Sequence, residues 1–293
     1  MPIITLIAAD SLKGHDIDAA ADQLRDAGLA VTGRDWIEEG VAADLTSGGE
    51  VSVVRDALSP LEETFDIVVQ PEGHRRKMLL ISDMDSTMIT VECIDELADY
   101  AGLKDEISAV TARAMRGELD FVEALRGRVK LLKGLEASAI KQCREERVRI
   151  MPGARELVRT MRGWGAQCIL VSGGFHHFAD PVAAEIGFHR AVANRLAVED
   201  DRLTGAVAGD IIDSAAKARL LADSMADLGL QTAHTLAVGD GANDIPMIEA
   251  AGLGIAYHAK PKAAAAADAA IRHGDLTALL YAQGVPRSEW AAG

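Results

Sequence analysis

The sequence has few cysteines, and no two of them have the spacing of a metal or redox motif. Its three cysteines, Cys93, Cys143 and Cys168, lie far apart along the chain. This excludes a disulfide framework and a zinc site, and it suits a reducing cytoplasm. A chain of 293 residues buries about three quarters of its unfolded surface, so it needs neither a disulfide nor a metal to fold.

Long hydrophobic runs are absent as well. The apolar runs are short and broken by polar residues, well below the ~20 residues needed to cross a membrane. The first residues, MPIITLIAADSLKGHD, lack the basic segment that opens a secretory signal. We therefore expect a cytoplasmic protein with no membrane partner.

Basic residues are outnumbered by acidic ones. The chain has 30 Lys and Arg against 45 Asp and Glu, a formal net charge of −15, and a pI of about 4.9. This balance argues against a broad surface for nucleic-acid phosphates, so we expect no nucleic-acid partner. It leaves room for a small positive pocket that binds a phosphorylated metabolite. A hydrophobic share of 49% with 26% charged residues indicates a globular protein.

Residues 1–70 are expected to form a small α+β domain of the ferredoxin-like or ACT-like type. The pattern runs in the order strand 3–7, helix 16–28, strand 29–38, helix 50–58 and strand 65–69. Asp16 could cap the first helix and Gly28 could end it. The segment PEGHRRK, residues 71–77, is a predicted linker.

Residues 78–293 have the pattern of an α/β domain with a Rossmann-like parallel sheet. Apolar runs alternate with helical patterns, which is typical of a parallel sheet covered on both faces. The strands are expected at 78–83, 168–172, 235–240 and 252–257. Because ligands bind beyond the carboxyl ends of such strands, the polar residues that end the first three should face one crevice.

Other segments of this domain are assigned by charge and turn residues. The interval from about 92 to 150 is charged, has helical spacing and contains no clear strand, so we expect a helical cap insertion there. Residues 152–165 are a predicted helix that begins at its proline and ends at its glycine. Residues 194–205 are a predicted hairpin with an acidic turn, and the Ala-rich stretch 263–270 is a predicted helix.

The pattern Asp83-Met84-Asp85-Ser86-Thr87 follows the first of these strands. Positions i and i+2 of an extended chain point to the same side, so Asp83 and Asp85 should project together. Two adjacent carboxylates need a cation or a proton to compensate them, and Mg²⁺ suits an all-oxygen site. The alternative is that the pattern is only a turn after a strand.

Two further segments could bind a phosphoryl group. Ser172 and Gly173 end the second strand, where a hydroxyl and bare backbone N–H groups can hold an anion. The same residues could instead form a turn that uses glycine for its conformation. Lys217, in a helical stretch, could supply the fixed positive charge that phosphoryl transfer requires.

The segment GDGAND follows the third strand. Asp240 could complete a metal site, with Gly241 leaving room for it. Asn243 and Asp244 could take part in the site or could simply cap the next helix.

Taken in order, these motifs resemble the haloacid dehalogenase superfamily of phosphotransferases over residues 77–284. The superfamily pattern includes a glutamate five residues after the threonine of DxDST, which is Glu92 here. Within the superfamily, the segment MRGELDFVEALRGRVKLLKG resembles the cap of members that hydrolyse O-phospho-L-serine. The cap residues that carry this closer resemblance are Met115, Phe121 and Arg128.

The resemblance implies a mechanism for the acidic residues. Asp83 would attack phosphorus and form an aspartyl-phosphate, and Asp85 would exchange protons with serine and water. Mg²⁺ would be held by Asp83, by Asp85 through its backbone carbonyl, and by Asp240. The product would be L-serine, in the last step of serine biosynthesis.

The resemblance also implies which residues hold the phosphoryl group. Ser172, the Gly173 N–H, Lys217 and Asn243 would contact its oxygens. Asp244 would contact neither the metal nor the phosphoryl group directly, and it would support Lys217 and the metal-bound waters.

Specificity would come from the cap. Arg128 would bind the substrate carboxylate and Glu92 the substrate ammonium group. Met115 and Phe121 would form an apolar wall that excludes water. The alternatives are cap core for Met115 and Phe121, and a surface ion pair for Arg128 and Glu92.

Three functions remain open at this level. The first is Mg²⁺-dependent hydrolysis of O-phosphoserine. The second is a phosphotransferase or phosphatase for another small phosphorylated amino acid or metabolite. The third is an amino-acid-sensing regulatory protein whose N-terminal module binds the amino acid. A homodimer is a possible assembly, and the sequence does not define the oligomeric state.

Overall fold

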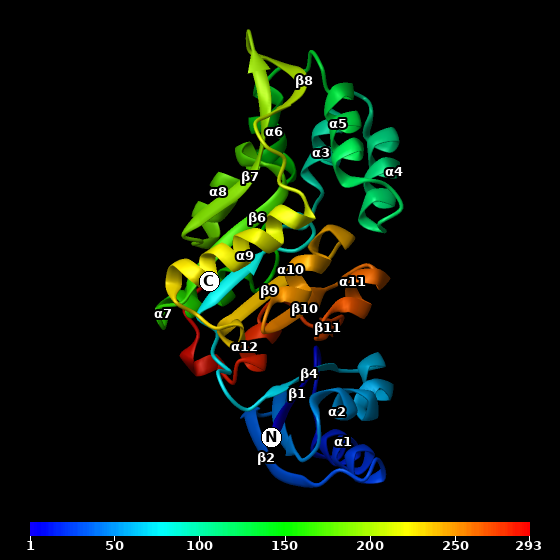
Figure 1. The fold of residues 1–293 in the computed structure, drawn as a ribbon, viewed down its shortest axis with the longest axis vertical. Helices are drawn as coiled ribbons and strands as arrows, with labels where there is room; N and C mark the ends of the chain where they lie inside the picture. Colours follow the sequence, from blue (N-terminus) through cyan, green and yellow to red (C-terminus); the bar gives the residue numbers. More distant parts are fainter.

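The computed structural model describes residues 1–293 and contains two β-sheets (Figure 1). A four-stranded sheet belongs to the N-terminal unit at the bottom of Figure 1, and a seven-stranded sheet belongs to the larger unit above it. Helices that follow the first strand of the larger sheet lie at the opposite end of the molecule from the N-terminal unit. None of the helices combines the length and the apolar character that crossing a membrane requires.

The N-terminal unit has the predicted ferredoxin-like topology. Its sheet has the order β2-β3-β1-β4, and all neighbouring strands are antiparallel. Ile4 and Leu6 of the central strand pack with Ile17 and Leu24 in a hydrophobic cluster of this unit. The elements are β1 (Pro2–Ile7), α1 (Gly14–Asp26), β2 (Val31–Glu38), β3 (Ala42–Ser47), α2 (Val51–Leu58), a 3-10 turn (Ser59–Glu63) and β4 (Asp66–Pro71).

The start of helix α1 corrects one expectation. The helix begins at Gly14 and its N-cap residue is Lys13, so the prediction that Asp16 is the cap was wrong. Asp16 lies in the first turn instead, and its Oδ2 accepts the Lys13 backbone N–H at 2.8 Å. An acidic residue at the third helical position can satisfy the N-cap amide in this way.

The seven-stranded sheet has the order β11-β10-β9-β5-β6-β7-β8. All neighbours are parallel except β7 and β8, which form the expected antiparallel hairpin. Strand β5 is central and lies between β6 and β9, so the ends of these three strands are adjacent. The strands are β5 (Leu79–Ser82), β6 (Gln167–Phe175), β7 (Arg190–Glu199), β8 (Arg202–Ala208), β9 (Thr235–Gly239), β10 (Leu253–Tyr257) and β11 (Ala269–Ile271).

The surroundings of β5 explain why its first three residues are all apolar. Leu79 and Ile81 pack with Leu221 and Met247 on one face of the sheet. Leu80 points the other way, into the largest hydrophobic cluster. Since side chains alternate across a strand, a strand with both faces covered needs apolar residues at every position.

The helices cover the sheet and form the cap. Helices α3 to α6 are inserted between β5 and α7, as expected for the interval from about 92 to 150. They appear in teal and green in the upper part of Figure 1. The helices are α3 (Cys93–Asp99), α4 (Lys104–Met115), α5 (Phe121–Leu131), α6 (Ser138–Arg147), α7 (Ala154–Gly163), α8 (His176–Ile186), α9 (Ser214–Leu228), α10 (Ile245–Ala250), α11 (Pro261–Ala266) and α12 (Ala278–Ala282).

Two helix boundaries differ from the prediction. Helix α7 begins at Ala154 rather than at Pro152, because Gly153 has φ +79° and a left-handed residue cannot continue a helix. The predicted helix 263–270 ends at Ala266, and Ala269 pairs with Ile255 as the start of the edge strand β11. Pairing with β10 here overrides the helix propensity of alanine.

The N-terminal unit is held against the larger unit by partly buried polar contacts. The carboxylate of Asp66, which is buried, accepts backbone N–H groups from residues 272, 273 and 274 at 2.7, 3.1 and 2.7 Å. Arg75, in the predicted linker, donates to both carboxylate oxygens of Asp44 and to the Ala282 carbonyl. Charge-assisted hydrogen bonds of this kind fix orientation as well as adding stability.

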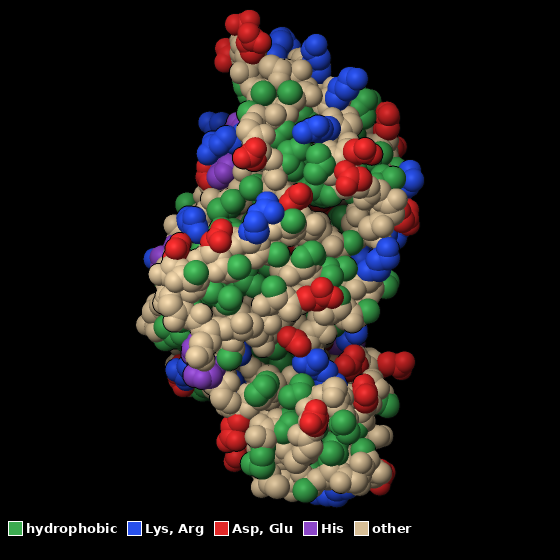
Figure 2. All heavy atoms as spheres, viewed as in Figure 1, with side chains coloured by type: hydrophobic (Ala, Val, Ile, Leu, Met, Phe, Trp, Pro, Cys, Tyr) green, Lys and Arg blue, Asp and Glu red, His purple; other side chains and the backbone are tan.

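The surface is mixed in charge. On the face shown in Figure 2, basic side chains are scattered among acidic ones and form no continuous basic patch. The turn between β7 and β8 carries Glu199, Asp200 and Asp201, and all three are exposed, as expected for solvated turn residues.

Candidate active site

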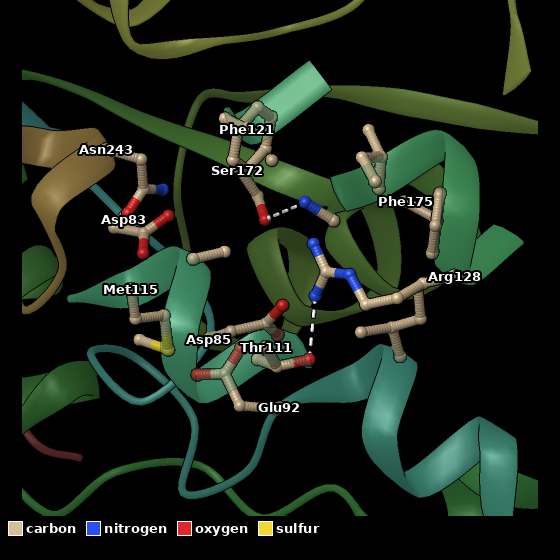
Figure 3. A pocket seen from close by; sticks show the side chains of 15 residues that line it. Asp83, Asp85, Glu92, Thr111, Met115, Phe121, Arg128, Ser172, Phe175 and Asn243 are labelled. Carbon is tan, nitrogen blue, oxygen red and sulfur yellow. Dashed lines mark hydrogen bonds between the residues drawn. The ribbon is translucent and has the colours of Figure 1, made fainter. Parts of the chain in front are cut away.

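The carboxyl ends of β5, β6 and β9 meet beneath the cap and form a pocket (Figure 3). Its free volume is about 50 Å³, so the cap leaves room for only a few water molecules over these strand ends. Figure 3 shows Ser172 and Phe121 on one side, Asp85 and Glu92 on the other, and the guanidinium of Arg128 between them. The predicted residues that line the pocket are Asp83, Asp85, Glu92, Met115, Phe121, Arg128, Ser172, Gly173 and Asn243.

The remaining predicted residues, which do not line the pocket, lie next to Asp83: they are Lys217, Asp240 and Asp244. Lys217 on α9 is fully buried, and its Nζ donates to Asp83 Oδ1 at 2.6 Å and to Asp244 Oδ1 at 2.7 Å. Burial opposes the charge on Lys217, but Asp244 and Asp83 outweigh it and raise the lysine pKa. Burial and the neighbouring Asp244 raise the pKa of Asp83, against the lowering effect of Lys217. The lysine therefore links the two carboxylates.

The Asp244 carboxylate is fully used by the protein. Its Oδ1 accepts from Lys217, and its Oδ2 accepts the backbone N–H groups of Asp240 and Gly241 at 3.2 and 3.0 Å. It is the N-cap residue of α10, but its side chain makes no capping hydrogen bond to that helix. This carboxylate thus orients the Asp240 loop and Lys217, and it has no vacant oxygen.

The geometry and donors suit a divalent cation. Carboxylate oxygens of Asp83, Asp240 and Asp244 lie within 4.8 Å of one another. Both carboxylate oxygens of Asp240 are buried without a hydrogen-bond partner, as is Oδ1 of Asp85. Burial, followed by repulsion from Asp244 and Glu92, raises the pKa of Asp240 well above its usual range. Unpartnered buried carboxylates of this kind fit a hard cation such as Mg²⁺.

Ser172 and Gly173 are held by neighbouring backbone and side-chain groups. The Gly174 N–H donates to Ser172 Oγ at 2.8 Å. Asn194, which is buried on β7, donates through Nδ2 to the Gly173 carbonyl at 2.8 Å and accepts the Ile212 N–H through Oδ1 at the same distance. The Asn194 amide therefore fixes the end of β6.

Glu92 lies just before α3 and faces the pocket. The Ser86 hydroxyl donates to Glu92 Oε1 at 2.6 Å. Ser86 has φ +55°, a conformation uncommon outside glycine, so the loop after β5 is locally strained where it meets Glu92.

Arg128 on α5 is not a surface residue, because only 5% of it is exposed. Its Nε donates to the Ala124 carbonyl at 3.2 Å, and its Nη1 donates to the Thr111 hydroxyl at 2.7 Å. Glu92 forms no ion pair with it within 4 Å. The interpretation of Arg128 and Glu92 as a surface ion pair was wrong, since both groups point into the pocket (Figure 3).

The cap touches the core through Phe121 and Met115. A Cβ added to Gly173 would lie 2.5 Å from Phe121 Cζ, and one added to Gly241 would lie 3.5 Å from Met115 Cε. The Lys262 ammonium also donates to the Gly117 carbonyl at the end of α4, at 3.4 Å. Phe121 and Met115 thus lie over the two glycine-containing loops, where they cover the pocket.

Four residues of the site were not predicted from the sequence. Ser86 was quoted only as part of a motif, and Asn194 only as the start of a hairpin. Thr111 and Asp95 lie on α4 and α3, and no sequence pattern distinguishes them from other polar residues of an amphipathic helix. Thr111 contacts Arg128 on α5, and Asp95 contacts Thr111, so both contacts cross between helices.

A parallel sheet with acidic side chains at its carboxyl edge, beneath a helical cap, fits a haloacid dehalogenase-like hydrolase. The chain matches the haloacid dehalogenase-like hydrolase family over residues 80–249 and belongs to that family. Members of this family generally use a metal ion. The resemblance and the fold predicted from the sequence are thereby confirmed.

Phosphoserine phosphatases are among the proteins to which the chain is similar. The chain is 46% identical over 247 residues to a phosphoserine phosphatase of Streptomyces coelicolor, with 83% of this chain and 60% of that protein covered. It is 36% identical over 292 residues to a probable phosphoserine phosphatase of Schizosaccharomyces pombe, which covers 97% of this chain and 95% of that one.

A solved structure of a phospho-aspartyl intermediate analogue of phosphoserine phosphatase is also similar. It is 39% identical, has a TM-score of 0.68, and covers 70% of this chain and 98% of its own. The chain spans between 56% and 64% of the length of four of the curated relatives that it matches.

Proposed function

We propose that the protein hydrolyses O-phospho-L-serine to L-serine and phosphate in a Mg²⁺-dependent reaction. The observation that carries the proposal is that Asp83, paired with buried Lys217, opens onto the same pocket as Arg128 and Glu92. The first pair suits phosphoryl transfer, and the second suits a zwitterionic amino acid. The names of the relatives, and the phospho-aspartyl analogue of one of them, support the same reaction.

The proposed chemistry has two displacements. An Asp83 carboxylate oxygen attacks phosphorus, and the bond between phosphorus and the serine oxygen breaks while Asp85 donates a proton to that oxygen. Asp85 then takes a proton from water, whose oxygen attacks phosphorus and releases phosphate from Asp83. Burial and the negative charges of Glu92 and Asp83 raise the pKa of Asp85, which favours the protonated form needed in the first displacement.

Asp83, Asp240 and the backbone carbonyl of Asp85 are the proposed ligands of the metal. Bound Mg²⁺ would neutralise charge on the phosphoryl oxygens. Asp244 is proposed to act from outside this set, because both its oxygens already accept hydrogen bonds from the protein. The Mg²⁺ assignment rests on the all-oxygen donors and the unpartnered carboxylates.

The phosphoryl group is proposed to contact Ser172, Gly173, Lys217 and Asn243. Lys217 supplies a positive charge that needs no reorganisation, because it is buried and already bonded to two carboxylates. Asn243 follows the Asp240 loop and lines the pocket.

The amino-acid part of the substrate is proposed to bind the cap. Arg128 donates hydrogen bonds to the substrate carboxylate, and the Glu92 carboxylate accepts hydrogen bonds from the substrate ammonium group. Met115 and Phe121 exclude water when they cover the pocket. This reaction would be the last step of serine biosynthesis and would take place in the cytoplasm, in keeping with three free, buried cysteines.

The domain organisation is part of the proposal. Residues 1–70 form an ACT-like domain, 71–77 a linker and 78–293 the phosphatase domain. Ile7 and Val68 of the N-terminal sheet belong to the hydrophobic cluster of the larger unit, which supports two domains that pack firmly together.

The test is phosphate release from O-phospho-L-serine, phosphothreonine and an aryl phosphate, each with Mg²⁺ and with EDTA. A metal-dependent preference for phosphoserine supports the proposal. Metal-dependent activity without that preference would favour the alternative substrate, another small phosphate ester, and would remove the roles of Arg128 and Glu92.

A further inference from the structure

We propose that Thr111 and Asp95 are positioning residues that hold Arg128 ready for the substrate carboxylate. The inference rests on the proposed function and extends it from the residue that binds the carboxylate to the residues that aim it. The Thr111 hydroxyl and the Asp95 carboxylate, from two other cap helices, form a hydrogen-bonded chain that ends at the Arg128 guanidinium. We call this chain the relay.

The chain of contacts is short and continuous. Arg128 Nη1 donates to Thr111 Oγ1 at 2.7 Å, and Thr111 Oγ1 donates to Asp95 Oδ1 at 2.6 Å (Figure 3 shows the first contact). The Ile107 carbonyl lies 3.1 Å from the same hydroxyl. A hydroxyl has one hydrogen, and the shorter contact to a charged acceptor takes it. Donation to Asp95 turns the lone pairs of Thr111 toward Arg128.

The three side chains are shielded from water. Arg128, Thr111 and Asp95 are only 5%, 3% and 9% exposed. In such a site the guanidinium cannot exchange a lost protein partner for bulk water at low cost. Burial lowers the pKa of Arg128, and the nearby carboxylates raise it. Among these carboxylates, Asp95 has the largest effect.

Counting donors shows what remains for the substrate. A guanidinium has five N–H groups. The Nε–H is used by the Ala124 carbonyl and one Nη1–H by Thr111, while Nη2 donates to no protein group. The protein thus uses the Nε–H and one Nη1–H and leaves the second Nη1–H and both Nη2–H groups for the substrate carboxylate. Without Thr111, Nη1 would lose the contact that sets the orientation of the guanidinium.

The experiment compares two substrates that differ only in the carboxylate: O-phospho-L-serine and O-phosphoethanolamine. Thr111→Val, which keeps the shape and removes the hydroxyl, should lower kcat/KM for phosphoserine about tenfold or more, mainly through KM. Activity on phosphoethanolamine should stay within twofold. Thr111→Ser should restore phosphoserine activity, and Thr160→Val, which removes a buried hydroxyl far from the pocket, should change neither substrate.

A double variant tests whether Thr111 acts through Arg128. In an Arg128→Ala background, Thr111→Val should cost no further activity on phosphoserine. Asp95→Asn keeps the acceptor oxygen but removes the charge, and it should also lower kcat/KM for phosphoserine more than for phosphoethanolamine. This variant replaces Thr111→Val if Thr111→Val does not fold. Equal losses on both substrates, or additive losses in the double variant, would overturn the relay.

The relay and the proposed function fail in different ways. If the wild-type protein hydrolyses phosphoethanolamine and an aryl phosphate but shows no preference for phosphoserine, the proposed function is wrong and the relay falls with it. If the wild-type protein prefers phosphoserine and Thr111→Val behaves like Thr160→Val, only the relay is wrong.

Discussion

The Nζ atom of Lys217, a residue with no exposed surface, lies 2.6 Å from Oδ1 of Asp83. The same ammonium group bonds Asp244, so one cation compensates two buried carboxylates. This arrangement holds the Asp83 carboxylate in place and, under the proposed function, sets a positive charge beside the phosphoryl group. The desolvation cost of a buried ion pair can exceed its Coulombic gain, so this pair is weak evidence for a role in stability.

Replacement of Lys217 tests that role. Lys217→Met should lower kcat by about 10²–10³ or more, because it removes a preorganised charge near the phosphoryl oxygens. The loss should be the same for phosphoserine and for an aryl phosphate, since the lysine does not contact the amino-acid part. Lys141→Met, at an exposed lysine of α6, should be neutral. A loss confined to phosphoserine would contradict the assignment.

Metal binding should be visible as stabilisation. Mg²⁺ should raise the Tm of the wild-type protein in a saturating manner, because it binds only the folded carboxylate cluster. Asp240→Asn should abolish this shift, whereas Asp227→Asn, at an exposed position of α9, should retain it.

In EDTA the same Asp240→Asn variant should melt no lower than the wild type. Burial and repulsion from Asp244 and Glu92 disfavour the Asp240 carboxylate, so a neutral side chain relieves that cost. Thermal melts with and without Mg²⁺ measure both effects. A full Mg²⁺ shift in Asp240→Asn would remove Asp240 from the ligand set.

A methyl group at position 173 should disturb the cap. Alanine there would place its Cβ 2.5 Å from Phe121 Cζ, so the ring must move. Gly173→Ala should lower kcat/KM for phosphoserine about tenfold or more, given the usual cost of overpacking. Gly127→Ala on α5, where no atom lies within 4 Å of the added Cβ, should leave activity unchanged and the Tm equal or higher. Equal activity of the two variants would show that the position of the Phe121 ring over the pocket does not require glycine at position 173.

The contact between the two units should depend on Asp66. Asp66→Ala leaves three partly buried backbone N–H groups without their acceptor and should lower the free energy of unfolding by roughly 1–3 kcal/mol. Urea unfolding measures this loss. Asp56→Ala, at an exposed residue of α2, is the control, and an equal effect of the two variants would mean that Asp66 does not secure the N-terminal unit.

The sequence was sufficient to predict the features that follow from local patterns. The buried parts of β5, β6, β9 and β10 are short apolar runs. Asp83 follows β5, Asp240 follows β9, and Ser172 lies near the carboxyl end of β6. The three residues share one edge because the strands are parallel and adjacent. The motifs at Asp83 and Asp240 depend on spacing within a few residues.

Features that depend on distant contacts could not be predicted in this way. The edge strand β11 exists because β10 offers a pairing edge, and alanine alone favours a helix. Strand β3 was given no residues, although its pairing with β1 and β2 is extensive. Thr111 and Asp95 are 16 residues apart and gain their role only when α3, α4 and α5 pack together.

The covalent intermediate on Asp83 is the central claim, and the most direct measurement is to trap it. Wild-type protein turning over O-phospho-L-serine with Mg²⁺ would be quenched in acid, treated with borohydride, which reduces an acyl phosphate to an alcohol, and digested for peptide mass spectrometry. We predict reduction at position 83 that requires both Mg²⁺ and substrate and is absent in Asp83→Asn. Active enzyme without reduction at position 83, or reduction at another carboxylate, would contradict the account.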